Sequence, residues 1–139
     1  MKYEKDVYVV IAICAIGILL IFGLSWVPNP NLKELTLIPS WITDWTDDYS
    51  NSRIRTAIPF ILLSLVIGAW FCSKRLSSHS YLWAWLLLTA IVILAEFGQY
   101  FIPLRDVDLK DIFWGSFGAL FGLGLMYLVD FSLQLLKLR

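Results

Sequence analysis

Four polar side chains interrupt an apolar part of the sequence near the end of its third hydrophobic run. Glu96 and Gln99 are three residues apart and therefore share one face of a helix, while Arg105 and Asp111 follow Pro103. The connection at Pro103 is short, so we expect these four side chains to form one polar cluster. A guanidinium group offers five donors in a planar fork that suits phosphate or carboxylate. The cluster predicts a site for an anionic group, with Glu96 and Asp111 holding Arg105 in place.

Three of these four residues also have a structural explanation. Asp108 and Asp111 are typical of a helix start. Arg105 can extend to lipid headgroups, and Glu96 can hydrogen-bond a neighbouring helix. Catalysis by Glu96 as a general acid or base is a further alternative. The sequence shows no evident pairing of a nucleophile with a base, which disfavours an enzyme.

The remaining reactive side chains do not suggest a cofactor or a nucleic acid. His79 is the one histidine, and Cys14 and Cys72 both lie inside apolar runs. This set is too small for a typical zinc or haem site, so we expect no metal and no cofactor. Eleven basic residues balance eleven acidic ones, and the basic residues are dispersed. We therefore expect no nucleic-acid partner.

The composition indicates a membrane protein of the all-α class. Of the 139 residues, 59% are hydrophobic and 16% charged, against roughly 25% charged in soluble domains. A membrane-spanning helix needs about 20 apolar residues, and four runs are long enough. We predict one domain over residues 1–139, a bundle of four transmembrane helices with spans of about 7–27, 56–73, 81–102 and 111–134.

Three local features refine this layout. The first run follows Lys2 and Lys5 but has no small-residue cleavage site, so we expect a retained span rather than a signal peptide. Pro59 is expected in the first turn of the second helix, where its missing N–H costs little. In the first loop, Trp41 and Trp45 are four residues apart. This spacing predicts a short interfacial helix, with a lid over an outer-leaflet site as the alternative.

The basic residues between the spans predict the orientation in a cell (inner) membrane. Cytoplasmic flanks tend to carry more Lys and Arg. With both termini cytoplasmic, the inner side carries Lys2, Lys5, Lys74, Arg75, Lys137 and Arg139, and the outer side carries Lys33, Arg53, Arg55, Arg105 and Lys110. Glu96 then lies in the outer leaflet, about 9 Å from the predicted end of its span.

Three glycines of the fourth run are expected to serve helix packing. Gly118 and Gly122 form a G-x-x-x-G step, and Gly115 precedes them by one turn. Small residues at this spacing let two helices approach closely in a membrane. We predict a packing role for all three.

The polar cluster and these glycines together resemble a known family. The pattern E-x-x-Q-x-x-x-P-x-R from Glu96 to Arg105, then Asp111 and the G-x-x-x-G step, is similar to the VanZ-like family of small bacterial membrane proteins. That family often carries an Asn at the position of Gly115, and an Asp-Lys pair and a His at the start of its second helix, where this chain has "SNSRIRTAIPF". The family is named for a protein linked to teicoplanin resistance, so the resemblance implies a cell-envelope setting.

Two functions follow as hypotheses. In the first, an outward-facing polar pocket binds an anionic lipid or envelope precursor, and Arg105 meets the phosphate. In the second, the chain is a non-catalytic accessory subunit packed on a larger membrane protein complex. The groups missing from the family pattern, the glycine-lined fourth helix and the seven tryptophans motivate the second hypothesis.

Overall fold

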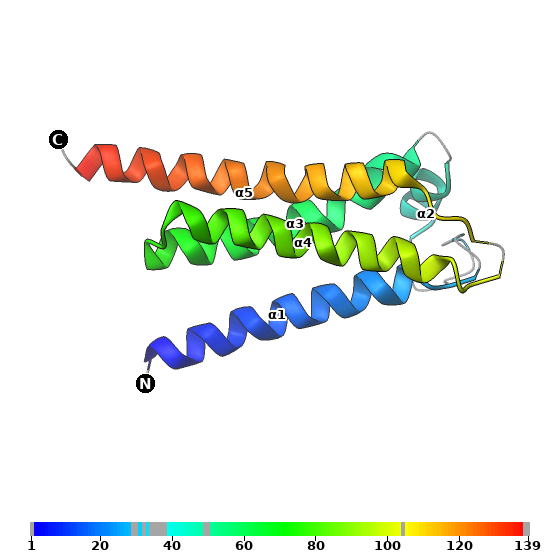
Figure 1. Ribbon diagram of the computed structural model, residues 1–139, viewed down its shortest axis with the longest axis horizontal. Coiled ribbons are helices and arrows are strands. Elements are labelled where there is room, and N and C mark those ends of the chain that lie inside the picture. Colours follow the sequence, from blue (N-terminus) through cyan, green and yellow to red (C-terminus); the bar gives the residue numbers. More distant parts are fainter. Residues whose placement is uncertain are drawn as a thin grey trace.

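The computed structural model describes residues 2–28, 31, 33, 39–48, 51–103 and 105–137, and this part of the chain is all-helical. Its helices are α1 (Lys2–Ser25), α2 (Ser40–Asp47), α3 (Ser52–Lys74), α4 (Ser78–Gln99) and α5 (Leu109–Lys137) (Figure 1). All but α2 are long and apolar enough to cross a membrane, which confirms the predicted fold class. The two ends of the predicted domain, including Arg139, lie outside the described residues.

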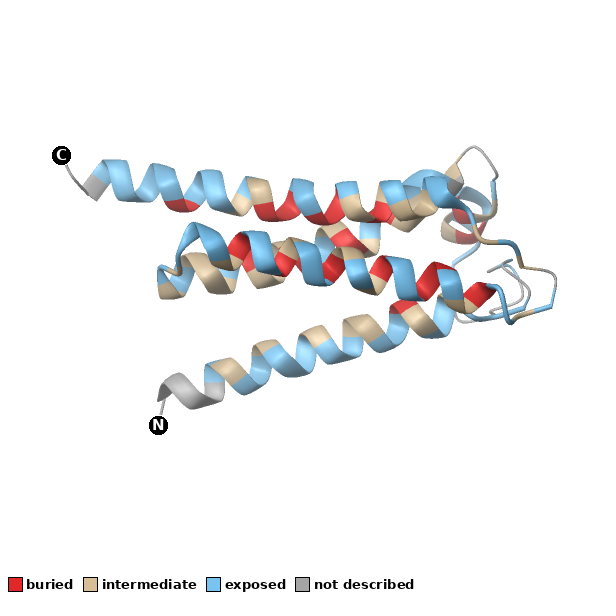
Figure 2. Cartoon of the chain, viewed as in Figure 1, coloured by how far each residue is buried: buried red, intermediate tan, exposed pale blue. Residues whose placement is uncertain are grey.

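The core lies between α3, α4 and α5. Helices α3 and α5 make the most extensive contact in the structure. Their buried residues face each other and α4, while the outer faces of all three helices are exposed (Figure 2). Large apolar side chains fill the centre, including Phe60, Leu63, Leu88, Val92 and Leu123. The exposed apolar faces suit a bilayer, where acyl chains replace water as the surroundings.

Helix α1 is attached mainly at its C-terminal end. Figure 1 shows it approaching the bundle near α2 and diverging from α4 toward its N-terminus. Among the described residues of α1, Ile21 alone belongs to the buried core. Just past the helix, the Trp26 indole Nε1 donates a hydrogen bond to the Ala95 carbonyl at 3.1 Å. The indole lies against Gly98, where a Cβ atom would meet the ring at 2.6 Å.

Two helix ends differ from the sequence-based expectation. Helix α3 begins at Ser52, so Pro59 lies inside the helix and not in its first turn. An interior proline removes the helical hydrogen bond to the carbonyl four residues earlier, which here is that of Arg55. Helix α4 ends at Gln99, before the predicted span end at Ile102. Both differences fall at the end of the bundle that carries α2 (Figure 1).

Candidate functional site

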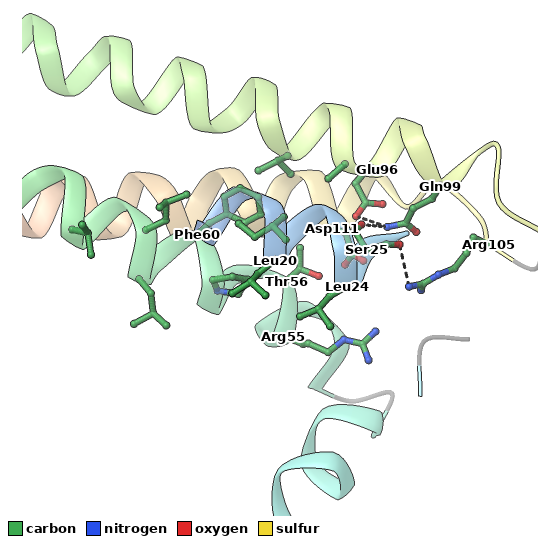
Figure 3. A pocket seen from close by; sticks show the side chains of 18 of the residues that line it. Leu20, Leu24, Ser25, Arg55, Thr56, Phe60, Glu96, Gln99, Arg105 and Asp111 are labelled. Carbon is green, nitrogen blue, oxygen red and sulfur yellow. Dashed lines mark hydrogen bonds between the residues drawn. The ribbon is translucent and has the colours of Figure 1, made fainter. Parts of the chain in front are cut away.

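All four residues of the predicted polar cluster line one cavity of about 440 Å³. Glu96 and Gln99 come from the last turn of α4, Arg105 from the connection that follows, and Asp111 from the first turn of α5. The cavity lies at the α2 end of the bundle and is bounded by α1 and α3 on its other sides (Figure 3). The short connection at Pro103 thus places the four side chains around a common space.

Glu96 and Gln99 form the buried part of the cluster. Their exposed fractions are 4% and 7%. The Gln99 amide Nε2 donates to Glu96 Oε1 at 3.2 Å and to the Ser25 hydroxyl at 2.8 Å. The Asp108 backbone N–H interacts with the same Glu96 carboxyl group. Glu96 Oε2 is also buried, and no described residue hydrogen-bonds it.

Arg105 is held by the end of α1. Its Nε donates to the Val27 carbonyl at 3.1 Å, and its Nη2 donates to the Ser25 carbonyl at 3.2 Å. The contact to Ser25 follows from helix geometry, because the last carbonyls of a helix lack intrahelical donors and carry partial negative charge. The prediction was that Glu96 and Asp111 hold Arg105 in place, whereas these hydrogen bonds go to the carbonyls of Val27 and Ser25.

The two carboxylates act on Arg105 through their charge. Burial lowers the pKa of the Arg105 guanidinium, and the nearby Arg55 lowers it further, whereas Glu96 and Asp111 raise it. An arginine stays protonated despite such shifts. The cavity end therefore combines two positive and two potentially negative groups in a restricted volume.

Asp111 and Arg55 complete the polar end of the cavity. Asp111 is half-buried, and the Thr56 hydroxyl donates a hydrogen bond to its carboxylate. Asp108, by contrast, accepts from the Lys110 N–H at 2.8 Å and caps α5. A role at the helix start was the structural explanation for both aspartates. It applies to Asp108, while Asp111 is among the cavity-lining residues. Arg55 Nη1 donates to the Thr46 carbonyl of α2 at 3.0 Å, which ties α2 to the cavity.

Away from this polar end, the cavity has apolar walls. They come mainly from α1 and α3, with Val92 of α4 at the back. The large apolar side chains of these walls include Ile13, Leu20, Ile21, Leu24, Phe60, Leu62 and Leu63. A space with charged groups at one end and aliphatic walls along the rest fits a molecule with a polar head and a hydrocarbon chain.

The three glycines of α5 lie at helix contacts. A Cβ atom at Gly115 would meet Val92 at 2.9 Å, and one at Gly118 would meet the Ala57 carbonyl oxygen at 2.6 Å. At Gly122 it would collide with the Ser64 side chain. These positions allow α5 to approach α3 and α4 closely.

Sequence reasoning missed three polar residues of the cavity. Arg55 and Thr56 lie at the start of the second apolar run. An arginine directly before a predicted span could have indicated a residue of the polar site. Ser25 gave no signal, because its role depends on where the end of α1 packs. No group of three potential metal ligands occurs among the residues that the structure describes.

Comparison with known proteins identifies the family of this chain. A family model described as VanZ/LLP1 matches residues 7–130. The chain belongs to the VanZ/LLP1 family. Comparison with curated proteins and with solved structures gave no match. The region matched by the VanZ/LLP1 model contains every residue that lines the cavity. Together with the four long apolar helices, family membership makes this chain a membrane protein.

Proposed function

We propose that this VanZ/LLP1 protein binds an anionic amphiphile, a membrane lipid or an envelope precursor, in the cavity beside α1. The phosphate lies at Arg105 and Arg55, and the hydrocarbon chain lies between α1 and α3. One observation carries the proposal: a single cavity joins two arginines to a long aliphatic wall. Neither feature alone would suggest a lipid.

The headgroup, rather than the chain, supplies the selectivity. A hydrocarbon chain leaving the bilayer for an apolar groove exchanges one apolar environment for another, so it gains little free energy. A phosphate bound by a guanidinium forms charge-assisted hydrogen bonds, which are about twice as strong as neutral ones. Binding should therefore depend on the charge of the ligand far more than on its chain length.

The proposed location is a cell membrane, with both termini cytoplasmic and the polar end of the cavity facing outward. Figure 1 supports a common side for the first and last helix ends, because α1 begins and α5 finishes at the same end of the bundle. The Lys and Arg distribution favours that end as the cytoplasmic one. The cavity then opens at the depth of outer-leaflet headgroups.

Native mass spectrometry of purified variants tests the proposal. Arg105→Ala and Arg55→Ala each remove one guanidinium from the cavity, while Arg53→Ala removes an exposed one from the same helix as Arg55. With dioleoyl phosphatidate as the probe, we expect the cavity variants to lose about tenfold in affinity, as for a charged hydrogen bond worth about 1.5 kcal/mol. Arg53→Ala should bind like the unaltered protein.

Two results would overturn this proposal. One is equal binding of phosphatidate and of phosphatidylcholine at matched chain length. The other is a loss in Arg53→Ala as large as that in Arg105→Ala, which would show that only the general surface charge matters.

A second candidate function is an accessory subunit of a larger membrane complex. The sparse packing of α1 favours it, since Ile21 is its one described core residue and large apolar side chains between Tyr8 and Leu24 are exposed. Gentle detergent extraction followed by native mass measurement addresses this candidate. A co-purifying protein at fixed stoichiometry would support it, and a monomer that carries only lipid would contradict it.

A further inference from the structure

We infer that the ligand carries a hydrogen-bond donor, a hydroxyl or amide N–H, between its chain and its phosphate, and that Glu96 and Asp111 recognise this donor. The inference rests on the proposed function, because it names the subclass of amphiphile that the same cavity takes. It concerns a part of the ligand that Arg105 and Arg55 do not contact.

The polar groups of the cavity are arranged in layers along the bundle. Arg105 lies in the connection beyond the helix ends, whereas Glu96 is one turn inside α4 and Asp111 is in the first turn of α5. One turn deeper are Phe60 and Val92, both buried. Figure 3 shows the same order, with Phe60 on one side of Asp111 and Glu96, and Arg105 on the other. A bound amphiphile therefore presents its chain, then its linking segment, then its phosphate to these layers.

Glu96 and Asp111 form the carboxylate layer of the cavity, and this layer has unused acceptor capacity. Glu96 Oε1 accepts from Gln99, but Oε2 is buried and has no partner in the described part of the chain. A buried acceptor without a partner costs free energy, so a ligand donor placed beside Oε2 would be favoured. An ionised carboxylate accepts hydrogen bonds only and cannot donate one. With both carboxylates ionised, the layer is thus matched to a donor and mismatched to another acceptor.

This requirement separates common lipid types. In a diacyl glycerophospholipid, both linking groups next to the phosphate are esters, which offer acceptors alone. A single-chain glycerol phosphate has a free hydroxyl at that position, and an amide-linked amphiphile has an N–H there. The cavity should therefore prefer such lipids to diacyl phosphatidate.

Affinity measurements with three acidic probes test this inference. The probes are oleoyl lysophosphatidate, its deoxy analogue in which hydrogen replaces the free hydroxyl, and dioleoyl phosphatidate. We expect the unaltered protein to bind the hydroxyl form about tenfold more tightly than the other two, equivalent to about 1.4 kcal/mol. In Glu96→Gln, and in Asp111→Asn as a second variant, the preference should shrink to less than about threefold. Asp106→Asn changes an exposed aspartate of the same connection and should leave it intact.

The outcomes distinguish this inference from the proposed function. If the unaltered protein binds all three probes equally and Arg105→Ala still weakens each of them, the donor requirement is wrong and the phosphate site stands. If Arg105→Ala weakens none of them, the proposed function itself fails. A preference for diacyl phosphatidate would also contradict the inference, because that lipid offers only acceptors to the carboxylates.

Discussion

Arg105 has a hydrogen-bonding capacity that its contacts with the described residues do not exhaust. A guanidinium has five N–H donors, and the carbonyls of Val27 and Ser25 take one from Nε and one from Nη2. Beyond these two bonds to described residues, the other donors can serve a phosphate while the side chain stays bonded to the end of α1. This division explains why an arginine suits the position: one part of the planar fork fixes its place and the other part binds.

Arg105→Lys tests this division at the residue scale. The ammonium keeps the charge but loses the planar fork, so it cannot serve two carbonyls and a phosphate in the same geometry. We expect phosphatidate affinity between that of the unaltered protein and that of Arg105→Ala, lower than the former by about threefold to fivefold, or up to about 1 kcal/mol. The same native mass titration measures it. Full retention of affinity would show that charge alone is sufficient.

The helices contribute unequally to the cavity. Helices α3, α4 and α5 form a packed core. Helix α1 joins it mainly through contacts near its C-terminal end, among them the bonds to Arg105 and Gln99 and that of the adjoining Trp26, while Asp6 near its start pairs with Lys74 of α3 at 3.9 Å. Since α1 supplies one whole wall of the cavity, the end of α1 and the polar groups of the site stabilise each other. The close α3–α5 contact provides the rigid opposite wall.

That contact depends on glycine, and a matched pair of substitutions measures how strongly. In Gly118→Ala the new Cβ would meet the Ala57 carbonyl oxygen at 2.6 Å, whereas in Gly124→Ala on the same helix nothing lies within 4 Å. We expect Gly118→Ala to lower the free energy of unfolding by about 1–3 kcal/mol, the usual cost of overpacking. Gly124→Ala should not destabilise the protein. Unfolding in mixed micelles with increasing sodium dodecyl sulfate gives both values, and equal stability of the two variants would contradict the packing role.

The sequence predicted the elements better than the contacts between them. Local apolar length and spacing predicted the four spans and the short helix that contains Trp41 and Trp45. They also predicted the grouping of residues around the Pro103 connection. The partners of Arg105 do not follow in this way, because they are backbone carbonyls at and just beyond the end of α1, which any residue type could supply. Ser25, whose hydroxyl also accepts from Gln99, was missed because its role depends on where the end of α1 packs. Pro59 was misplaced because α3 starts at Ser52, within a polar segment that hydropathy assigns to the loop.

At the scale of the whole molecule, the proposal requires one orientation in the membrane. The connection that carries Asp106 and Arg105 must face outward, and the α3–α4 turn that carries Ser77 must face the cytoplasm. In a background without Cys14 and Cys72, we expect Asp106→Cys to react with a membrane-impermeant maleimide in intact cells. Ser77→Cys should react only after lysis. Both side chains are exposed, so accessibility within the fold does not bias the comparison. The opposite labelling pattern would place the cavity in the inner leaflet.

The most direct measurement locates the hydrocarbon chain of a bound acidic lipid. A phosphatidate with a photoreactive group in its acyl chain, crosslinked in the purified protein, should label the cavity walls around Leu24 of α1 and Leu62 of α3. Arg105→Ala should reduce that labelling about tenfold and leave the exposed face of α5 around Leu128 unchanged. Labelling spread evenly over both surfaces, and unaffected by Arg105→Ala, would contradict the claim that this cavity holds an anionic amphiphile.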